Sequence, residues 1–130
     1  MANQIVFNSF KRIQEFGNDF WETFYFRFVQ SNVEIQILFK DTNMENQYRM
    51  LSQSISYIML NSNSESPHTT KHMVELITLH NKKLKIPKAH FIVWKECFLS
   101  TLKDFDPSYD ELVEKTWCEA IDKMLAKFGI

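Results

Sequence analysis

Hydrophobic residues recur with a helical period along almost the whole chain. The first predicted helix covers about residues 4–16 and carries an apolar stripe of Ile5, Phe10, Ile13 and Phe16. A second helix is predicted over about 18–30, in the segment NDFWETFYFRFVQ. This segment is so aromatic that more than one of its faces must be covered. No segment alternates convincingly between apolar and polar residues, and no Asn-Gly or Asp-Gly pair marks a hairpin.

Two capping boxes predict helix starts in the first half of the chain. In SNVE, Ser31 can cap a helix while Glu34 reaches back to the cap, and a short helical turn follows that ends at 38–39. TNME repeats the arrangement with Thr42 as the cap and opens a helix of about 43–60.

Prolines predict three more helix starts. Pro67, Pro87 and Pro107 each stand where a proline at the first helical position is favourable. The predicted helices run over about 67–83, 87–105 and 107–128. The pattern therefore predicts an all-α fold of six or seven helices, forming one domain over residues 1–130.

Composition excludes several classes of function. The 130 residues carry a formal net charge of −1, which gives no bulk attraction to nucleic acid or an acidic membrane. With two glycines the chain has neither a phosphate-binding glycine loop nor a dinucleotide fingerprint. No apolar run is long enough to span a membrane, and the polar N-terminus is unlike a signal peptide. We therefore expect a cytoplasmic protein whose thiols, Cys97 and Cys118, are reduced and buried.

The segment LHNKKLKIP at 79–87 places a lone histidine, His80, on the apolar stripe of a predicted helix. One interpretation is a core histidine whose ring is satisfied by a backbone group. The other is a metal ligand facing a pocket. His68 and His72 have a spacing that can bind zinc, but a solvated face suits them better because no carboxylate or cysteine cluster joins them. The 12 Phe, 3 Trp and 4 Tyr suit either an aromatic core or aromatics around a flat ligand.

Several segments together resemble globins, and bacterial single-domain haemoglobins in particular. HNKKLKIP resembles the end of the globin F helix, which would make His80 the haem-iron ligand. FYFRFVQSNVEIQILF resembles the B–C segment, with Tyr25 at the distal tyrosine position and Phe39 at the phenylalanine that packs on the haem. MENQYRMLSQSISYI resembles the start of the E helix, with Gln47 at the distal position and Leu51 one turn later.

The resemblance implies a globin-like three-over-three helical sandwich that binds haem b (iron protoporphyrin IX) through His80. Leu76, Ile86 and Phe91 would join Phe39 and Leu51 as apolar haem contacts. Trp94 falls on a position that faces the distal pocket in many globins, where its indole N–H could be a third donor, although a packing tryptophan is an equal alternative. His90 is expected to face the surface or a propionate edge.

The implied function is reversible binding of O2, or of NO or CO, for oxygen transport or sensing. Tyr25 and Gln47 would donate hydrogen bonds to bound oxygen, each contributing on the order of 1–3 kcal/mol in a dry pocket. One alternative is a haem redox enzyme, a nitric oxide dioxygenase or nitrite reductase served by a separate reductase. Another is a globin-fold regulatory module acting by protein contact. The chain is primarily expected to be a binding protein, as a monomer or dimer.

Overall fold

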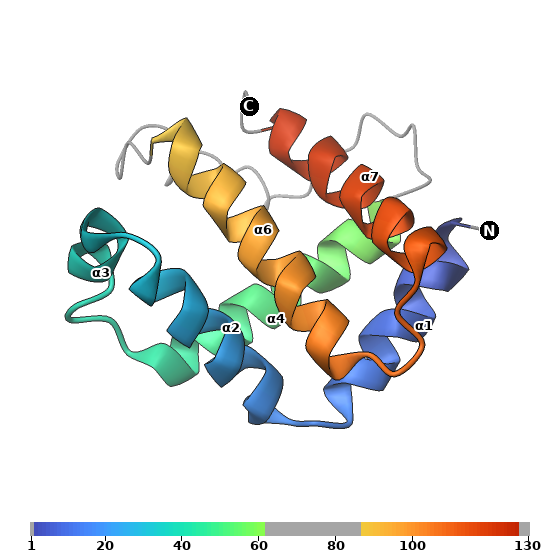
Figure 1. Ribbon diagram of the computed structural model, residues 1–130, viewed down its shortest axis with the longest axis horizontal. Coiled ribbons are helices and arrows are strands. Elements are labelled where there is room, and N and C mark those ends of the chain that lie inside the picture. Colours follow the sequence, from blue (N-terminus) through green and yellow to red (C-terminus); the bar gives the residue numbers. More distant parts are fainter. Residues whose placement is uncertain (1, 62–86, 128–130) are drawn as a thin grey trace.

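Every regular element that the structure describes is a helix. The computed structural model describes residues 2–61 and 87–127, and no strand occurs in these two stretches. In chain order the helices are α1 (Ala2–Gln14), α2 (Asn18–Gln30), α3 (Val33–Leu38), α4 (Met44–Asn61), α6 (Lys88–Phe105) and α7 (Glu111–Lys127) (Figure 1). The predicted all-α class is therefore confirmed.

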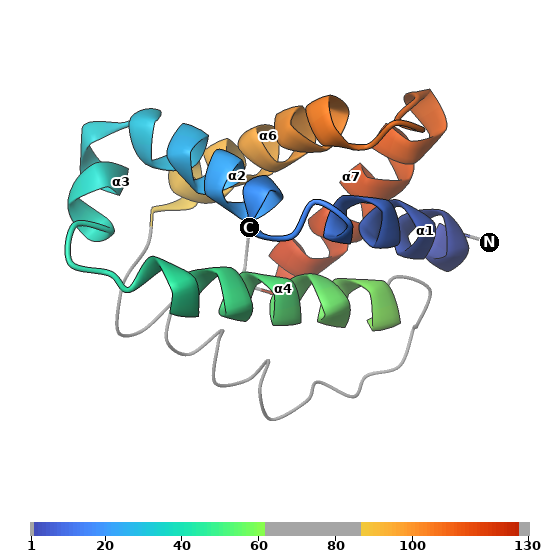
Figure 2. The same ribbon diagram turned by 90° about the horizontal axis from the view of Figure 1, so that it is seen from below.

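The helices cross one another in layers. α2 packs against α6, α6 against α7, and α7 against α1. Figure 2 shows α4 stretched along one side of these helices, where it contacts α1, α2 and α7. The short α3 lies at one end of the molecule, beyond the end of α2. Helices distant in sequence, α2 with α4 and α6, are thereby brought together.

The cap of α3 differs from the prediction by one residue. Ser31 keeps helical backbone angles (φ −70°, ψ −24°), so it still belongs to the end of α2, and its Oγ donates to the Phe28 carbonyl at 2.5 Å. Asn32 is extended (φ −159°), and its side chain accepts from the Glu34 backbone N–H at 2.7 Å. Asn32 therefore caps the helix, because only an extended residue can aim its side chain at the first free N–H groups.

The starts of α4 and α7 also move. Asn43, rather than Thr42, caps α4 by accepting from the Asn46 N–H at 3.2 Å. The helix predicted from 107 begins instead at Glu111, where Asp110 Oδ1 accepts from the Val113 N–H at 2.8 Å. Pro107 lies in a turn before this cap.

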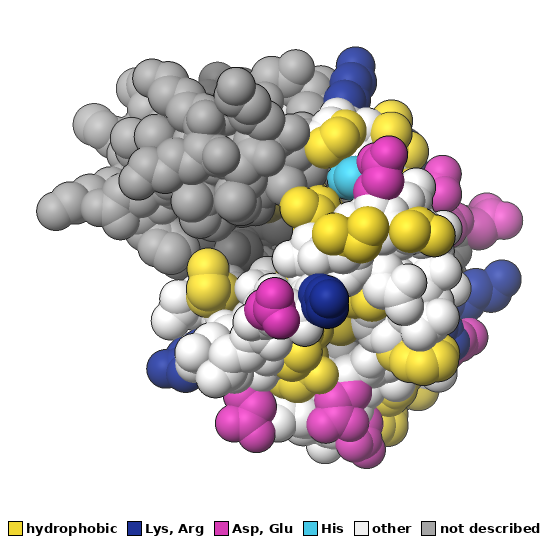
Figure 3. All heavy atoms as spheres, turned by 90° about the vertical axis from the view of Figure 1, so that its left-hand side faces the viewer, with side chains coloured by type: hydrophobic (Ala, Val, Ile, Leu, Met, Phe, Trp, Pro, Cys, Tyr) yellow, Lys and Arg dark blue, Asp and Glu magenta, His cyan; other side chains and the backbone are white. Residues whose placement is uncertain are grey.

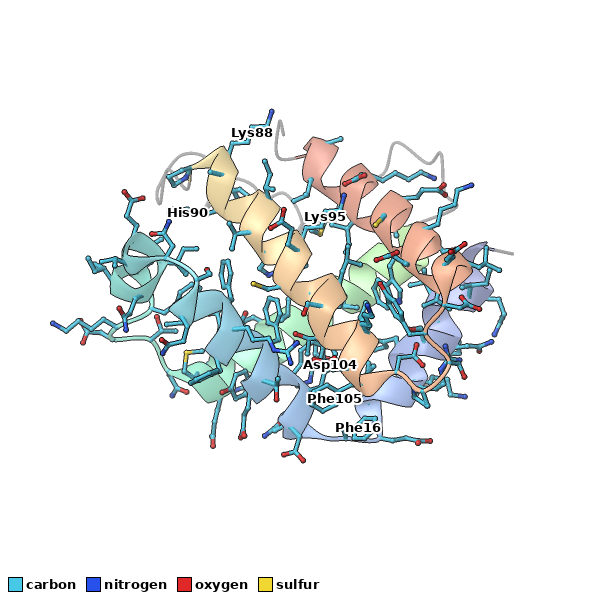
Figure 4. The ribbon with its side chains drawn as sticks, viewed as in Figure 1. Phe16, Lys88, His90, Lys95, Asp104 and Phe105 are labelled. Carbon is cyan, nitrogen blue, oxygen red and sulfur yellow. The ribbon has the colours of Figure 1, made fainter. Side chains whose placement is uncertain are left out.

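The core is built largely from aromatic rings. Phe20 contacts Phe98 edge-on with ring centroids 5.8 Å apart, and Phe98 contacts Trp117 at 5.2 Å, so one cluster joins α2, α6 and α7. Phe16 and Phe105 meet edge-on at 5.1 Å and hold the turn before α2 against the end of α6 (Figure 4). The described residues therefore form an aromatic core.

A buried polar cluster ties α1 to the connection between α6 and α7. Asp106 is 3% exposed and accepts from Ser9 Oγ at 2.6 Å and from Arg12 Nη2 at 2.9 Å. Trp117 Nε1 donates to Ser9 Oγ at 2.9 Å. Burial alone would raise the pKa of Asp106, but the hydrogen bonds from Arg12 and Ser9 outweigh it and hold that pKa below its ordinary value.

The two thiols lie on α6 and α7. Cys97 and Cys118 are free, as expected, but half-buried rather than buried. Burial is the main cause that raises the pKa of each thiol, so both favour the protonated form.

Candidate functional site

Tyr25 and Gln47, from different helices, meet at the centre of the candidate site. Tyr25 lies on α2 and is 3% exposed, and Gln47 lies on the first turn of α4 and is half-buried. Gln47 Nε2 donates a hydrogen bond to Tyr25 Oη at 3.2 Å. The tyrosine oxygen is thus an acceptor toward Gln47, and in residues 2–61 and 87–127 nothing accepts its own hydroxyl proton.

The electrostatics of Tyr25 keep this hydroxyl protonated. Burial raises its pKa well above the ordinary value, and the hydrogen bond from Gln47 opposes that rise only in part. The neighbouring Tyr48 is half-buried, and burial together with the charges of Glu22 and Glu45 raises its pKa as well. Near neutral pH, Tyr25 is therefore a neutral hydrogen-bond donor.

Aromatic and aliphatic side chains surround the pair. The Phe39 ring lies 5.8 Å from that of Tyr25, and the Tyr48 ring lies 5.6 Å from it on the α4 side. Leu51, one helical turn after Gln47, is 6% exposed. The structure thus gathers Tyr25, Phe39, Gln47 and Leu51, as the resemblance to globins implied, and adds Tyr48.

Trp94 lies on α6, and the ring of Phe24 lies between it and this group. Its indole stacks on Phe98 with centroids 5.3 Å apart, and it meets Phe24 edge-on at 5.7 Å. Phe24 in turn contacts Tyr25 at 4.9 Å. Phe91 is half-buried and packs against the same core. These contacts give Trp94 a packing role, and a further role as a donor stays a prediction.

His90 is the residue whose surroundings the sequence predicted least well. It is 5% exposed, so the surface location offered for it is wrong. Its Nε2 lies 3.2 Å from Glu34 Oε2 on α3, and its Nδ1 has no hydrogen-bond partner among the described residues. The available signal was its position four residues before Trp94, which places both on one face of α6.

Some of the predicted site residues lie outside the described residues. These are His80, Leu76 and Ile86, together with His68 and His72. Within residues 2–61 and 87–127, no group of three or more His, Cys, Asp or Glu side chains could hold a metal ion. In the same part of the chain, no helix is long and apolar enough to cross a membrane.

Comparison with known proteins identifies the fold and the family. The solved structure of the protein PA3967 from Pseudomonas aeruginosa, described as structurally highly homologous to a human haemoglobin, matches with a TM-score of 0.88 at 20% identity. The match covers 98% of this chain and 95% of that one. No curated protein matches the chain. The globin family model matches residues 22–128, and the chain therefore belongs to the globin family.

Proposed function

We propose that this globin binds haem b and, on the haem, O2 or a related diatomic gas, as a single domain over residues 1–130. The observation that carries the proposal is the buried Tyr25 hydroxyl, which accepts from Gln47 and has no acceptor for its own proton among the described residues. A buried phenol oxygen needs a hydrogen-bond partner in any fold, and here the partner is a donor, which leaves the hydroxyl's own proton to be donated.

Two features of the described residues fit haem. A neutral phenol donor lies among Phe39, Tyr48 and Leu51, which are side chains that suit a flat apolar ring. The buried Nδ1 of His90, without a partner among the described residues, suits a ligand that also carries polar groups. Haem, when bound, supplies an iron that takes up diatomic gases reversibly.

Three of the protein's own residues have separate roles in this proposal. His80 is the proposed iron ligand, and a bond from its second ring nitrogen to the Leu76 carbonyl would hold it as a neutral imidazole. Tyr25 would donate to O2, which carries partial negative charge when bound, and would therefore favour O2 over the less polar CO. Gln47 fixes the direction of the Tyr25 hydroxyl and is the second donor near the ligand.

Apolar side chains keep water away from the iron in this proposal. Phe39 and Leu51 lie beside the donor pair, and Phe91 packs against the core on α6. Leu76 and Ile86 complete the set of proposed haem contacts. Excluding water strengthens hydrogen bonds to the ligand and slows the oxidation of ferrous iron.

Absorption spectra of the purified protein test the proposal. With haem added, the ferric, dithionite-reduced and oxygenated forms should give three distinct spectra, and the oxygenated form should return to the reduced one when oxygen is removed. A chain that takes up no haem, with no intense band near 400 nm after desalting, would overturn the proposal. A globin-fold regulatory module that acts without haem would then be favoured.

A further inference from the structure

The short helix α3 carries apolar side chains on two opposite sides. Ile35 is fully buried and attaches the helix to the core, whereas Val33 is 69% exposed and Ile37 is 66% exposed. In a helix of about 3.6 residues per turn, Val33 and Ile37 lie one turn apart, on the side directly opposite Ile35. A helix that is apolar on both sides is normally covered on both, so the outer side of α3 indicates a partner.

This outer side of α3 lies at one end of the molecule, beyond the end of α2. Figure 3 views that end and shows exposed hydrophobic side chains, with acidic and basic side chains among them. Of the large hydrophobic side chains that the structure describes, Val33, Phe26 and Ile37 are the most exposed. The apolar surface that the fold leaves uncovered is therefore concentrated on α3 and the second half of α2.

Charged side chains of opposite sign flank the outer side of α3. Glu34 comes three residues before Ile37, its side chain is 73% exposed, and its Oε2 lies 3.2 Å from His90 Nε2. Lys40 comes three residues after Ile37, is exposed, and has no ion pair with the described residues. Asp41, also exposed, lies one residue farther from Ile37.

This spacing makes the outer side of α3 complementary to itself. A second copy, antiparallel and related by a two-fold axis near Ile37, would bring Glu34 of each copy opposite Lys40 of the other. A two-fold interface requires such a pattern, because the same surface contributes both partners of every contact. A partner of another kind would need no such relation between the two charges.

We propose that the outer side of α3 binds a second copy of this chain, with Ile37 packed near the two-fold axis and Glu34 paired with Lys40 of the partner subunit. The proposal does not depend on haem. A standard interface covers about 800 Å² on each partner, and a surface built on one helix of six residues is smaller. We therefore expect a weak dimer, with a Kd on the order of 10–100 µM.

Sedimentation equilibrium of the full chain, at concentrations up to about 1 mM, tests the apolar part of the interface. The wild type should dimerise, and Ile37→Ser should raise the Kd about tenfold or more, because both copies lose the contact. Leu112→Ser is the control: Leu112 is 57% exposed but lies on α7, so the Kd should stay within about twofold. A wild type that is monomeric at about 1 mM, or equal effects of the two substitutions, would overturn the proposal.

Charge reversal tests the pairing of the two copies. Glu34→Lys and Lys40→Glu each replace two attractive contacts by two repulsive ones, so each variant alone should dimerise about ten times more weakly. An equimolar mixture of the two variants should dimerise about as well as the wild type, because each copy then meets the opposite charge. Asp41→Lys changes the charge by as much as Glu34→Lys but should not weaken the dimer.

Circular dichroism of each variant should match that of the wild type, which separates loss of pairing from loss of folding. Added salt should reduce the effects of charge reversal and leave the effect of Ile37→Ser in place. Single variants that dimerise as well as the wild type, or a mixture that dimerises no better than either variant alone, would overturn the proposal.

Discussion

The amide of Gln47 on α4 donates to the phenol oxygen of Tyr25 on α2 at 3.2 Å, so the tyrosine accepts on one side and can donate on the other. The two residues are 22 positions apart in the chain, and the bond also joins α2 to α4. Because Gln47 is the donor in this bond, the Tyr25 hydroxyl can direct its own proton toward a ligand. The predictions for substitutions of Tyr25 and Gln47 depend on this direction.

Replacing Tyr25 by Phe removes the free hydroxyl and nearly preserves the shape of the side chain. At about 1.4 kcal/mol per tenfold, losing one good hydrogen bond predicts an oxygen dissociation rate about ten to a hundred times higher. CO dissociation should change less, because bound CO is less polar. Stopped-flow mixing of the oxygenated protein measures both rates.

Tyr48→Phe is the matched control for that experiment. Its ring contacts the Tyr25 ring at 5.6 Å, yet the Tyr48 hydroxyl is not the one that Gln47 holds. The rate in Tyr48→Phe should stay within about twofold of the wild type. If Tyr48→Phe raised the oxygen dissociation rate and Tyr25→Phe did not, the donor would be Tyr48.

Replacing Gln47 by Glu tests the direction of the bond rather than its presence. A carboxylate at this position can only accept, so it would draw the Tyr25 proton toward itself and away from the ligand. We expect the oxygen dissociation rate to rise nearly as far as in Tyr25→Phe. Gln47→Leu removes the donor to Tyr25 but adds no acceptor that competes for the Tyr25 proton. The oxygen dissociation rate should therefore rise less, by about three- to tenfold. A higher oxygen dissociation rate in Gln47→Leu than in Gln47→Glu would contradict this account.

His80→Ala should abolish stable haem binding or make it depend on added imidazole. The prediction comes from the position of His80 on the apolar stripe and the following KKLKIP. His72→Ala is the control, since His72 is predicted to lie on a solvated face. Haem content after desalting, with and without imidazole, measures the effect. Full haem content with an unchanged reduced spectrum in His80→Ala would show that another group binds the iron.

Asp106→Asn should lower the free energy of unfolding by about 2–3 kcal/mol at pH 7, because Arg12 and Ser9 lose a buried charged acceptor. Asp104→Asn is the control: Asp104 also pairs with an arginine, Arg27, but its side chain is 53% exposed, so the loss should stay below about 1 kcal/mol. Urea unfolding followed by circular dichroism measures both. Equal losses would contradict the role given to burial.

The Asp106 effect should also depend on pH. Its pKa is lowered in the folded chain, so the carboxylate stabilises the fold fully above the pKa of the unfolded residue, about 3.9. This stabilisation is lost as the pH falls through the lower folded pKa. The difference between wild type and Asp106→Asn should therefore shrink below about pH 4. A difference that stayed constant from pH 7 to pH 3 would mean that shape, not charge, causes it.

The sequence by itself determined the helical class and most of the helices. The apolar period of NDFWETFYFRFVQ predicted α2 over the residues where it is found, Asn18–Gln30. The resemblance of the segments around Tyr25, Phe39, Gln47 and Leu51 to globins also implied that these residues would meet, and the helical period placed Gln47 and Leu51 on one face. Caps were misplaced by one residue at Ser31 and Thr42, since neighbouring polar residues can all cap and only the backbone angles select one.

Only the tertiary structure decided which polar atoms are buried and what they face. Sequence spacing placed Gln47 near Tyr25, but the direction of their bond depends on how α4 crosses α2. His90 was expected at the surface or at a propionate edge, yet it is buried and its Nε2 lies 3.2 Å from Glu34 Oε2 on α3. Burial and hydrogen-bond direction depend on contacts between helices that are distant in the chain. A local pattern of residues therefore cannot predict them.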